Sequence, residues 1–203
     1  MLTCSVGNPV LQASPAMFSS LLSSCSRRSA LLLGITAVFF SLVGARAEDP
    51  ATFEVADFTF ARPADWKWVQ VNSPMRKAQL RVGGSEAASG ADVTFFYFTG
   101  EGGNAEANTK RWLAQFQSKP GAEKVEKKDF GATKVTFVTT EGTFASGMPG
   151  QPATPLADYA LLGAIMEGKE GSVFVKATGP AGFMKDLRGK FDEFIAAAAK
   201  TRK

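Results

Sequence analysis

The sequence contains no histidine, and both of its cysteines, Cys4 and Cys25, lie near its beginning. Structural zinc sites, haem proteins and iron–sulfur proteins take most of their ligands from these two residue types. Ser-His-Asp and Cys-His catalytic sites need them as well. An Asp-x-Asp-x-Asp loop of the calcium-binding type does not occur either. We therefore expect no metal and no cofactor, and any catalysis would depend on carboxylates, lysine, tyrosine or serine alone.

Acidic residues are also absent from the beginning of the chain, since the first one is Glu48. The pair Arg27-Arg28 precedes an apolar run at 30–43, and the triplet Ala45-Arg46-Ala47 follows it. This order is typical of a signal peptide, here residues 1–47 with cleavage after Ala47. The run is shorter than the roughly 20 residues of a membrane-spanning helix. We expect a periplasmic or secreted bacterial protein with no stable membrane span after cleavage.

Alternatives for this N-terminus stay open. Export could follow the Sec or the twin-arginine route, and translation could begin at Met1 or Met17. If residues 1–25 were a plastid transit peptide, the protein would reach a thylakoid lumen. No Arg or Lys precedes Arg27, and this absence favours bacterial export.

Removal of the signal peptide changes the charge and redox character of the chain. Three arginines and both cysteines leave, so the formal net charge falls from +4 to about +1 and no disulfide can form. Binding to nucleic acid needs a concentrated basic face, and we expect none. Residues 48–203 fit a single globular domain with a short leader, because a chain of that size buries roughly 70% of its unfolded surface.

Short alternations of apolar and polar residues predict most of the secondary structure. They indicate strands at 53–60, 66–71, 77–82, 93–98, 124–129, 134–140, 159–166 and 172–178. Helical spacing predicts a helix from Ala105 to about Gln117, capped by Asn104, and a second from Phe183 to Ala198. Glycine and proline predict a loop at 141–158. The predicted class is α+β, a mainly antiparallel sheet packed with two main helices.

The element order resembles the Mog1/PsbP-like α/β sandwich, in which a short turn followed by Trp lies near the start, here Pro63-Ala64-Asp65-Trp66. PsbP-like domains serve as accessory subunits of larger complexes, so the resemblance implies that role. The chain also resembles a family of uncharacterised exported bacterial proteins, through residues 73–78, 95–98, 108–116, 159–165 and 174–180. This second resemblance implies no activity.

Basic and amide side chains on one strand and one helix form the best candidate binding surface. The residue pattern contributes Arg76, Lys77, Asn108, Arg111 and Gln115, with Trp112 as the anchor of the helix; Tyr159 and Lys176 come from the stretches that carry the resemblance. The alternative is that these cations are the solvated sides of an amphipathic helix and strand. Residues 142–158 are a second candidate, because long irregular loops are often binding loops.

We therefore expect an exported accessory or binding protein of unknown ligand, and we favour one without catalytic activity. Its partner would be an envelope protein or complex and not a nucleic acid. One alternative is a carboxylate-dependent envelope hydrolase, which predicts two acids in one cleft, drawn from Glu101, Glu106, Asp129, Glu141 and Asp158. The other is a carrier of a hydrophobic ligand, motivated by the 17 phenylalanines, which predicts a cavity in place of a filled core.

Overall fold

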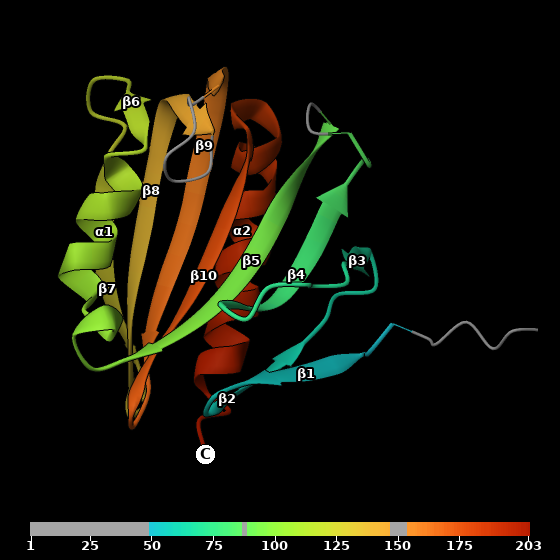
Figure 1. Cartoon of the computed structure of the whole chain (residues 1–203), viewed down its shortest axis with the longest axis vertical. Helices are drawn as coiled ribbons and strands as arrows, with labels where there is room; N and C mark the ends of the chain where they lie inside the picture. Colours follow the sequence, from blue (N-terminus) through green and yellow to red (C-terminus); the bar gives the residue numbers. More distant parts are fainter. Residues whose placement is uncertain (1–48, 87–88, 147–153) are drawn as a thin grey trace, which may run out of the picture. The chain divides into compact units, whose positions relative to one another are not determined.

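An antiparallel sheet with a helix on each face forms the body of the protein (Figure 1). The computed structural model describes residues 49–86, 89–146 and 154–203. The strands are β1 (Thr52–Val55), β2 (Phe58–Ala61), β3 (Trp66–Trp68), β4 (Arg76–Gly83), β5 (Gly90–Thr99), β6 (Phe116–Ser118), β7 (Lys124–Phe130), β8 (Thr133–Ser146), β9 (Thr154–Glu167) and β10 (Gly171–Pro180). The helices are η2 (Gly100–Gly103), α1 (Ala105–Leu113) and α2 (Ala181–Ala199). The predicted signal peptide lies outside the described residues.

The main sheet has the strand order β3-β4-β5-β10-β9-β8-β6, and β7 pairs with β8 beside β6. Every strand pairing in it is antiparallel. The predicted α+β class, with a mainly antiparallel sheet and two main helices, is confirmed. None of the helices in the described ranges has both the length and the apolar character needed to cross a membrane.

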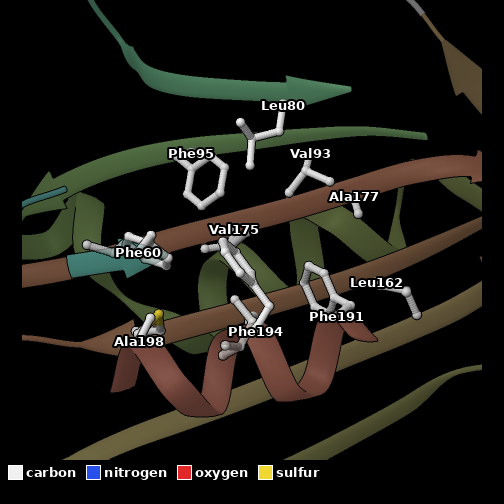
Figure 2. Close-up of a cluster of buried hydrophobic side chains, with 14 of the residues drawn as sticks. Phe60, Leu80, Val93, Phe95, Leu162, Val175, Ala177, Phe191, Phe194 and Ala198 are labelled. Carbon is white, nitrogen blue, oxygen red and sulfur yellow. The ribbon is translucent and has the colours of Figure 1, made fainter. Parts of the chain in front are cut away.

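One face of the sheet is covered by α2 and by the β1–β2 hairpin. The helix directs a buried stripe toward the strands, at Met184, Leu187, Phe191, Phe194, Ile195 and Ala198. Phe194 lies 4.9 Å from Trp66 between ring centroids, and Phe60 lies 5.1 Å from Phe95. Figure 2 shows Phe60, Phe95 and Phe194 among the side chains that fill the layer between α2 and the sheet. The C-terminal helix was therefore predicted correctly, and this is the larger core.

The opposite face is covered only in part, by α1. A smaller cluster lies beneath it, consisting of Trp112, Phe116, Val138, Leu161, Ile165 and Phe174. Asn104 caps the helix as predicted, because its side-chain oxygen accepts a hydrogen bond from the backbone nitrogen of Ala107 at 2.9 Å. Since α1 covers the β8–β9–β10 side, neither of the two main helices in the described residues covers the β4–β5 side of this face.

The predicted end of α1 was wrong, and one short strand after it was not predicted. The helix was expected to reach Gln117, but it ends at Leu113, and Phe116–Ser118 forms strand β6 against β8. The Phe116 ring stacks on Phe144 with 4.8 Å between centroids. Helical spacing in the sequence does not reveal this pairing, because tertiary contacts decide the conformation of so short a segment.

The loop expected at 141–158 was also wrong at both ends. Strand β8 continues to Ser146 and β9 begins at Thr154, so only 147–153 stand between them, and these lie outside the described residues. A register shift lies beside Gly142, and Asp158 opposite has φ 52°. A β-bulge or a similar register shift lets a strand continue past residues that do not fit regular pairing.

The chain end is fastened to the first hairpin, which was predicted as a single strand. The backbone nitrogen of Thr59 donates to Thr201 Oγ1 at 2.9 Å. The single proton of that hydroxyl is within hydrogen-bond distance of two carbonyls, that of Ala198 at 2.7 Å and that of Thr59 at 3.1 Å. The backbone nitrogen of Lys203 donates to the carbonyl of Asp57 at 3.1 Å, and its side chain pairs with Glu54. These contacts hold β1 and β2 to the end of α2.

Candidate functional site

A β-bulge in β4 sets up the polar face of the sheet. Arg76 pairs with Phe96 and Ala78 pairs with Phe95, so Lys77 is an extra residue between them. In a regular strand, residues three apart point to opposite faces. The bulge places Arg76 and Gln79 on the same face, where the Arg76 guanidinium donates to Gln79 Oε1 at 2.5 Å.

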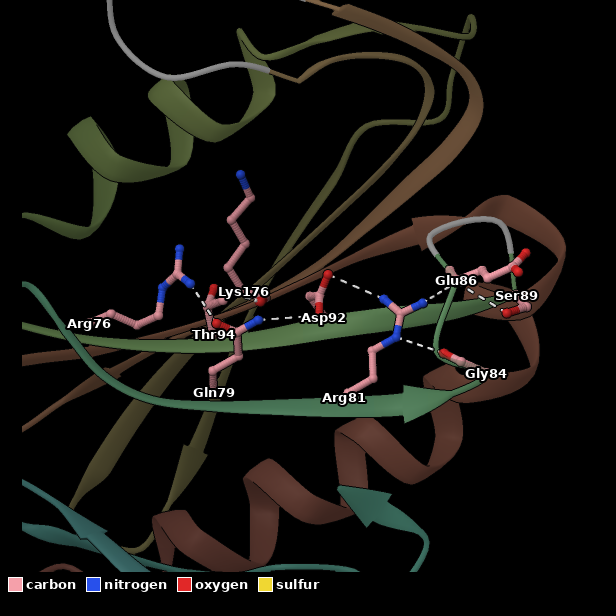
Figure 3. A network of polar contacts seen from close by, with 9 residues as sticks. All are labelled: Arg76, Gln79, Arg81, Gly84, Glu86, Ser89, Asp92, Thr94 and Lys176. Carbon is pink, nitrogen blue, oxygen red and sulfur yellow. Dashed lines mark hydrogen bonds and ion pairs between the residues drawn. The ribbon is translucent and has the colours of Figure 1, made fainter. Parts of the chain in front are cut away.

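We call the group Arg76, Gln79, Arg81, Asp92, Thr94 and Lys176 the β4–β10 face. Figure 3 shows these side chains on the side of the sheet opposite α2. Gln79 Nε2 donates to Asp92 Oδ1 at 3.3 Å, and the other carboxylate oxygen of Asp92 lies 3.2 Å from Arg81 Nη1. Three cations thus share this face with one carboxylate.

Arg81 is committed to the structure of the sheet edge. Its Nε donates to the carbonyl of Gly84 at 2.8 Å, and its Nη2 donates to that of Glu86. With Asp92 included, each of the three guanidinium nitrogens has an acceptor. Arg81 thus links β4 to the carbonyls of the segment that follows it. We therefore assign Arg81 a structural role and not a binding one.

Arg76 lacks such partners. Its Nε is buried and has no hydrogen-bond acceptor, and within the described residues the side chain makes no ion pair. A guanidinium has five N–H donors. In the described residues, the Arg76 guanidinium donates one hydrogen bond, to the side-chain oxygen of Gln79. Arg76 therefore retains donors for a ligand.

Lys176 is the second cation of the β4–β10 face without an ion pair in the described part of the chain, and it lies in the middle of the sheet. Its strand neighbours are Thr94 on β5 and Gly163 on β9. The ammonium donates to the Gln115 side-chain oxygen and lies 5.1 Å over the Phe144 ring. Burial lowers the pKa of Lys176 to about 8, because desolvation disfavours the charged form.

Aromatic rings form a wall beside Lys176. Phe144 stacks between Phe116, at 4.8 Å, and Tyr159, at 6.2 Å between centroids. After the end of α1 the chain turns toward the sheet, where the backbone nitrogen of Ala145 donates to the backbone carbonyl of Gln115 at 2.8 Å. This contact places the side-chain oxygen of Gln115 next to the Lys176 ammonium. The predicted residues Gln115, Tyr159 and Lys176 are thereby brought to one place.

The remaining predicted residues have other roles. Asn108 is buried, and its amide nitrogen donates to the carbonyls of Gly102 and Asn104 at 3.0 and 2.8 Å. Trp112 is buried as the anchor of α1, as expected. Arg111 is exposed and donates to the Asn108 oxygen. Lys77 is exposed at the bulge, and its ammonium lies 3.5 Å from the carbonyl of Pro74.

Sequence reasoning did not single out Gln79, Asp92 or Thr94 as members of a site, and it included Phe144 only as part of the candidate loop at 142–158. Side chains alternate between the two faces of a strand. In β5, Asp92 and Thr94 therefore lie on the same face as Phe96, and the sequence alone could have placed them there. The position of Arg76 could not, because the alternation in the sequence does not show the bulge.

Grooves elsewhere in the described part of the chain bear on the two alternatives. Asp129 and Glu167 line one groove together with Lys127 and Lys134. Both acids are exposed, and of the two only Asp129 is among the acids from which the hydrolase hypothesis drew its pair. This groove therefore gives the hydrolase hypothesis no support.

A second groove lies between α2 and β9, with Leu162 and Met184 in its lining and a volume of about 260 Å³. Pockets for drug-sized ligands measure about 300–1,000 Å³, so this groove is small. The layer between α2 and the sheet is filled by side chains (Figure 2). The carrier hypothesis, which needs a cavity, gains no support.

Comparison with known proteins yields a structural likeness alone. No protein-family model and no curated protein matches the chain. Among solved structures, the chain is similar to the solution structure of cyanobacterial PsbP (CyanoP) from Synechocystis sp. PCC 6803. The sequence identity is 13%, the match covers 77% of this chain and 96% of that chain, and the TM-score is 0.46.

Proposed function

We propose that the chain is an exported, non-catalytic accessory or binding protein, and that it engages an acidic surface of an envelope protein or complex. The observation that carries the proposal is the pair of cations on the β4–β10 face, Arg76 and Lys176, which have no carboxylate partner among the described residues. Placing a charge at a partly buried position costs free energy unless it is paired. A partner that brings a carboxylate would recover that free energy.

The acidic group of the same face is already engaged. The one acid of the β4–β10 face, Asp92, is held by Arg81 and Gln79, so it is not free to act as a base. The sequence supplies no histidine. A surface with two unpaired cations beside aromatic rings is suited to recognition, since aromatic and arginine side chains are enriched at protein interfaces.

The experiment combines localisation with native capture. The full chain, with its own N-terminus, is expressed in a bacterial host, and the protein is isolated from each cell fraction with whatever is bound to it. We expect a processed chain in the periplasm or medium, and a partner in stoichiometric amount. Arg76→Glu should release the partner, because it replaces attraction for an acidic surface by repulsion.

Lys185→Glu is the matched control. Lys185 is exposed on α2, on the opposite face of the sheet, so the substitution changes the net charge equally and leaves the β4–β10 face intact. Retention of the partner by Lys185→Glu and its loss by Arg76→Glu would support the proposal. An unprocessed cytoplasmic chain, a monomer without partner, or a partner retained by both variants would refute it.

A further inference from the structure

Arg76 and Lys176 share a second property, which is the chemical type of their hydrogen-bond acceptors in the folded protein. Arg76 donates to the side-chain oxygen of Gln79, and Lys176 donates to that of Gln115. Both acceptors are neutral amides. A hydrogen bond between an ionised donor and a carboxylate is stronger than one to a neutral acceptor, so each amide oxygen is an acceptor that a carboxylate can replace.

The surroundings of Lys176 indicate what is attached to that carboxylate. The ammonium lies over the Phe144 ring, which stacks with Phe116 and Tyr159. An aromatic wall binds apolar or aromatic groups through dispersion and ring contacts. Inorganic phosphate is an anion without an apolar group. An organic acid with an apolar body has an anionic group for the cations and an apolar group for the aromatic rings.

We propose that the β4–β10 face is a binding site for an organic carboxylate, whose anionic group displaces Gln79 and Gln115 from Arg76 and Lys176 and whose apolar body packs against the partly exposed edges of the stacked Phe144 and Tyr159 rings. This inference rests on the proposed function and names the group that it recognises. The carboxylate belongs either to a small organic acid or to an acidic side chain of the partner with an apolar neighbour.

The strand register makes the arrangement possible. Gln79 and Lys176 both neighbour Thr94, on either side of β5. Arg76 pairs with Phe96, two residues farther along β5. Strands lie about 4.8 Å apart and rise about 3.4 Å per residue, so the backbones of Arg76 and Lys176 are separated by roughly 12 Å. Arg76 and Lys176 carry long side chains on the same face (Figure 3), and one bound group can receive hydrogen bonds from both.

The experiment is an NMR titration of the protein in the form that accumulates in expressing cells. The probe is 3-phenylpropionate, with its neutral amide and inorganic phosphate at equal ionic strength as comparisons. We expect the acid alone to shift the Arg76 Nε–H signal and the backbone signals of Gln115 and Lys176. Arg76→Gln and Lys176→Gln should each weaken binding about tenfold or more, as expected for the loss of a charge-assisted hydrogen bond.

Two further variants separate recognition from folding. Gln115→Ala removes the neutral acceptor that competes with the ligand for Lys176, so it should tighten binding, and Lys185→Gln should have no effect. Equal shifts with the amide or with phosphate, or binding that survives both cation substitutions, would overturn the carboxylate site. If the captured partner is lost with Arg76→Glu while 3-phenylpropionate does not bind, the site for a small acid is wrong and the proposed function stands.

Discussion

The indole of Trp112 lies directly on the backbone of Gly163. A Cβ atom built at Gly163 would lie 2.4 Å from Trp112 Cζ3, a distance that real Cβ atoms do not reach. Gly163 is also the strand neighbour of Lys176. The absence of a side chain at this position therefore lets α1 approach the sheet next to the candidate site.

Gly163→Ala should destabilise the protein by about 1–3 kcal/mol, because the added methyl group forces the Trp112 ring off the sheet. Chemical denaturation measures the change. Gly189→Ala is the matched control. Gly189 is exposed in α2 with no atom within 4 Å of its built Cβ, so alanine should stabilise by about 0.5–1 kcal/mol through its helix propensity. Equal effects of the two substitutions would contradict the role of Gly163.

The depressed pKa of Lys176 predicts a pH dependence. Its pKa is about 8 in the folded protein, below its ordinary value of 10.5, so the unfolded chain binds more protons between these values. The contribution of Lys176 to stability should rise with pH from about 8 to 10.5 and stay constant below 8. Carboxylate binding should weaken above pH 8, where the amine loses its charge.

Lys176→Met tests the statement about stability. The variant should lose the rise in denaturation midpoint between pH 8 and 10.5, relative to the native chain measured in parallel. A native chain and a Lys176→Met variant with the same pH profile would show that the amine titrates as it does in the unfolded chain.

Thr201 should matter more to stability than the terminal ion pair. Thr201→Val removes both hydrogen bonds to the Thr59 backbone and should cost about 1 kcal/mol. Lys203→Gln removes the pair with Glu54, which is exposed on both sides, and exposed pairs contribute little. Thermal unfolding of the two variants compares them. A larger loss from Lys203→Gln would contradict this ranking.

Asn108→Ala should loosen the start of α1. The substitution leaves the carbonyls of Gly102 and Asn104 without the Asn108 amide and removes the acceptor of Arg111. We expect a loss of about 2 kcal/mol by chemical denaturation, since buried polar groups without partners are costly. Lys110→Ala, on the exposed side of the same helix, should unfold like the native chain.

The sequence predicted the class and most strands because their alternation matches their burial. In β4, Ala78, Leu80 and Val82 are buried as expected, and α2 buries the residues that recur at helical spacing. Prediction failed where long-range pairing decided. Examples are β6, which forms because β8 lies beside it, and the extended arms of β8 and β9.

The candidate site was predicted only in part for the same reason. Gln115, Tyr159 and Lys176 do meet, but their contacts depend on Phe144, which the sequence placed in a loop. Arg76 joins this face because of a bulge that leaves no pattern in the residues. Asn108 had been expected at the surface and is buried.

The sheet separates a large apolar cluster under α2 from a cluster of six buried residues under α1. Segments held by few buried contacts open locally at lower free energy than the rest of a domain. Amide hydrogens of α1 should thus exchange with solvent before those of α2. Gln115 follows α1 and its side chain accepts a hydrogen bond from Lys176. Local unfolding of α1 and binding of a ligand to Lys176 are therefore coupled equilibria, and each changes the other by the same free energy. Exchange at α1 would then report on a ligand that never contacts the helix.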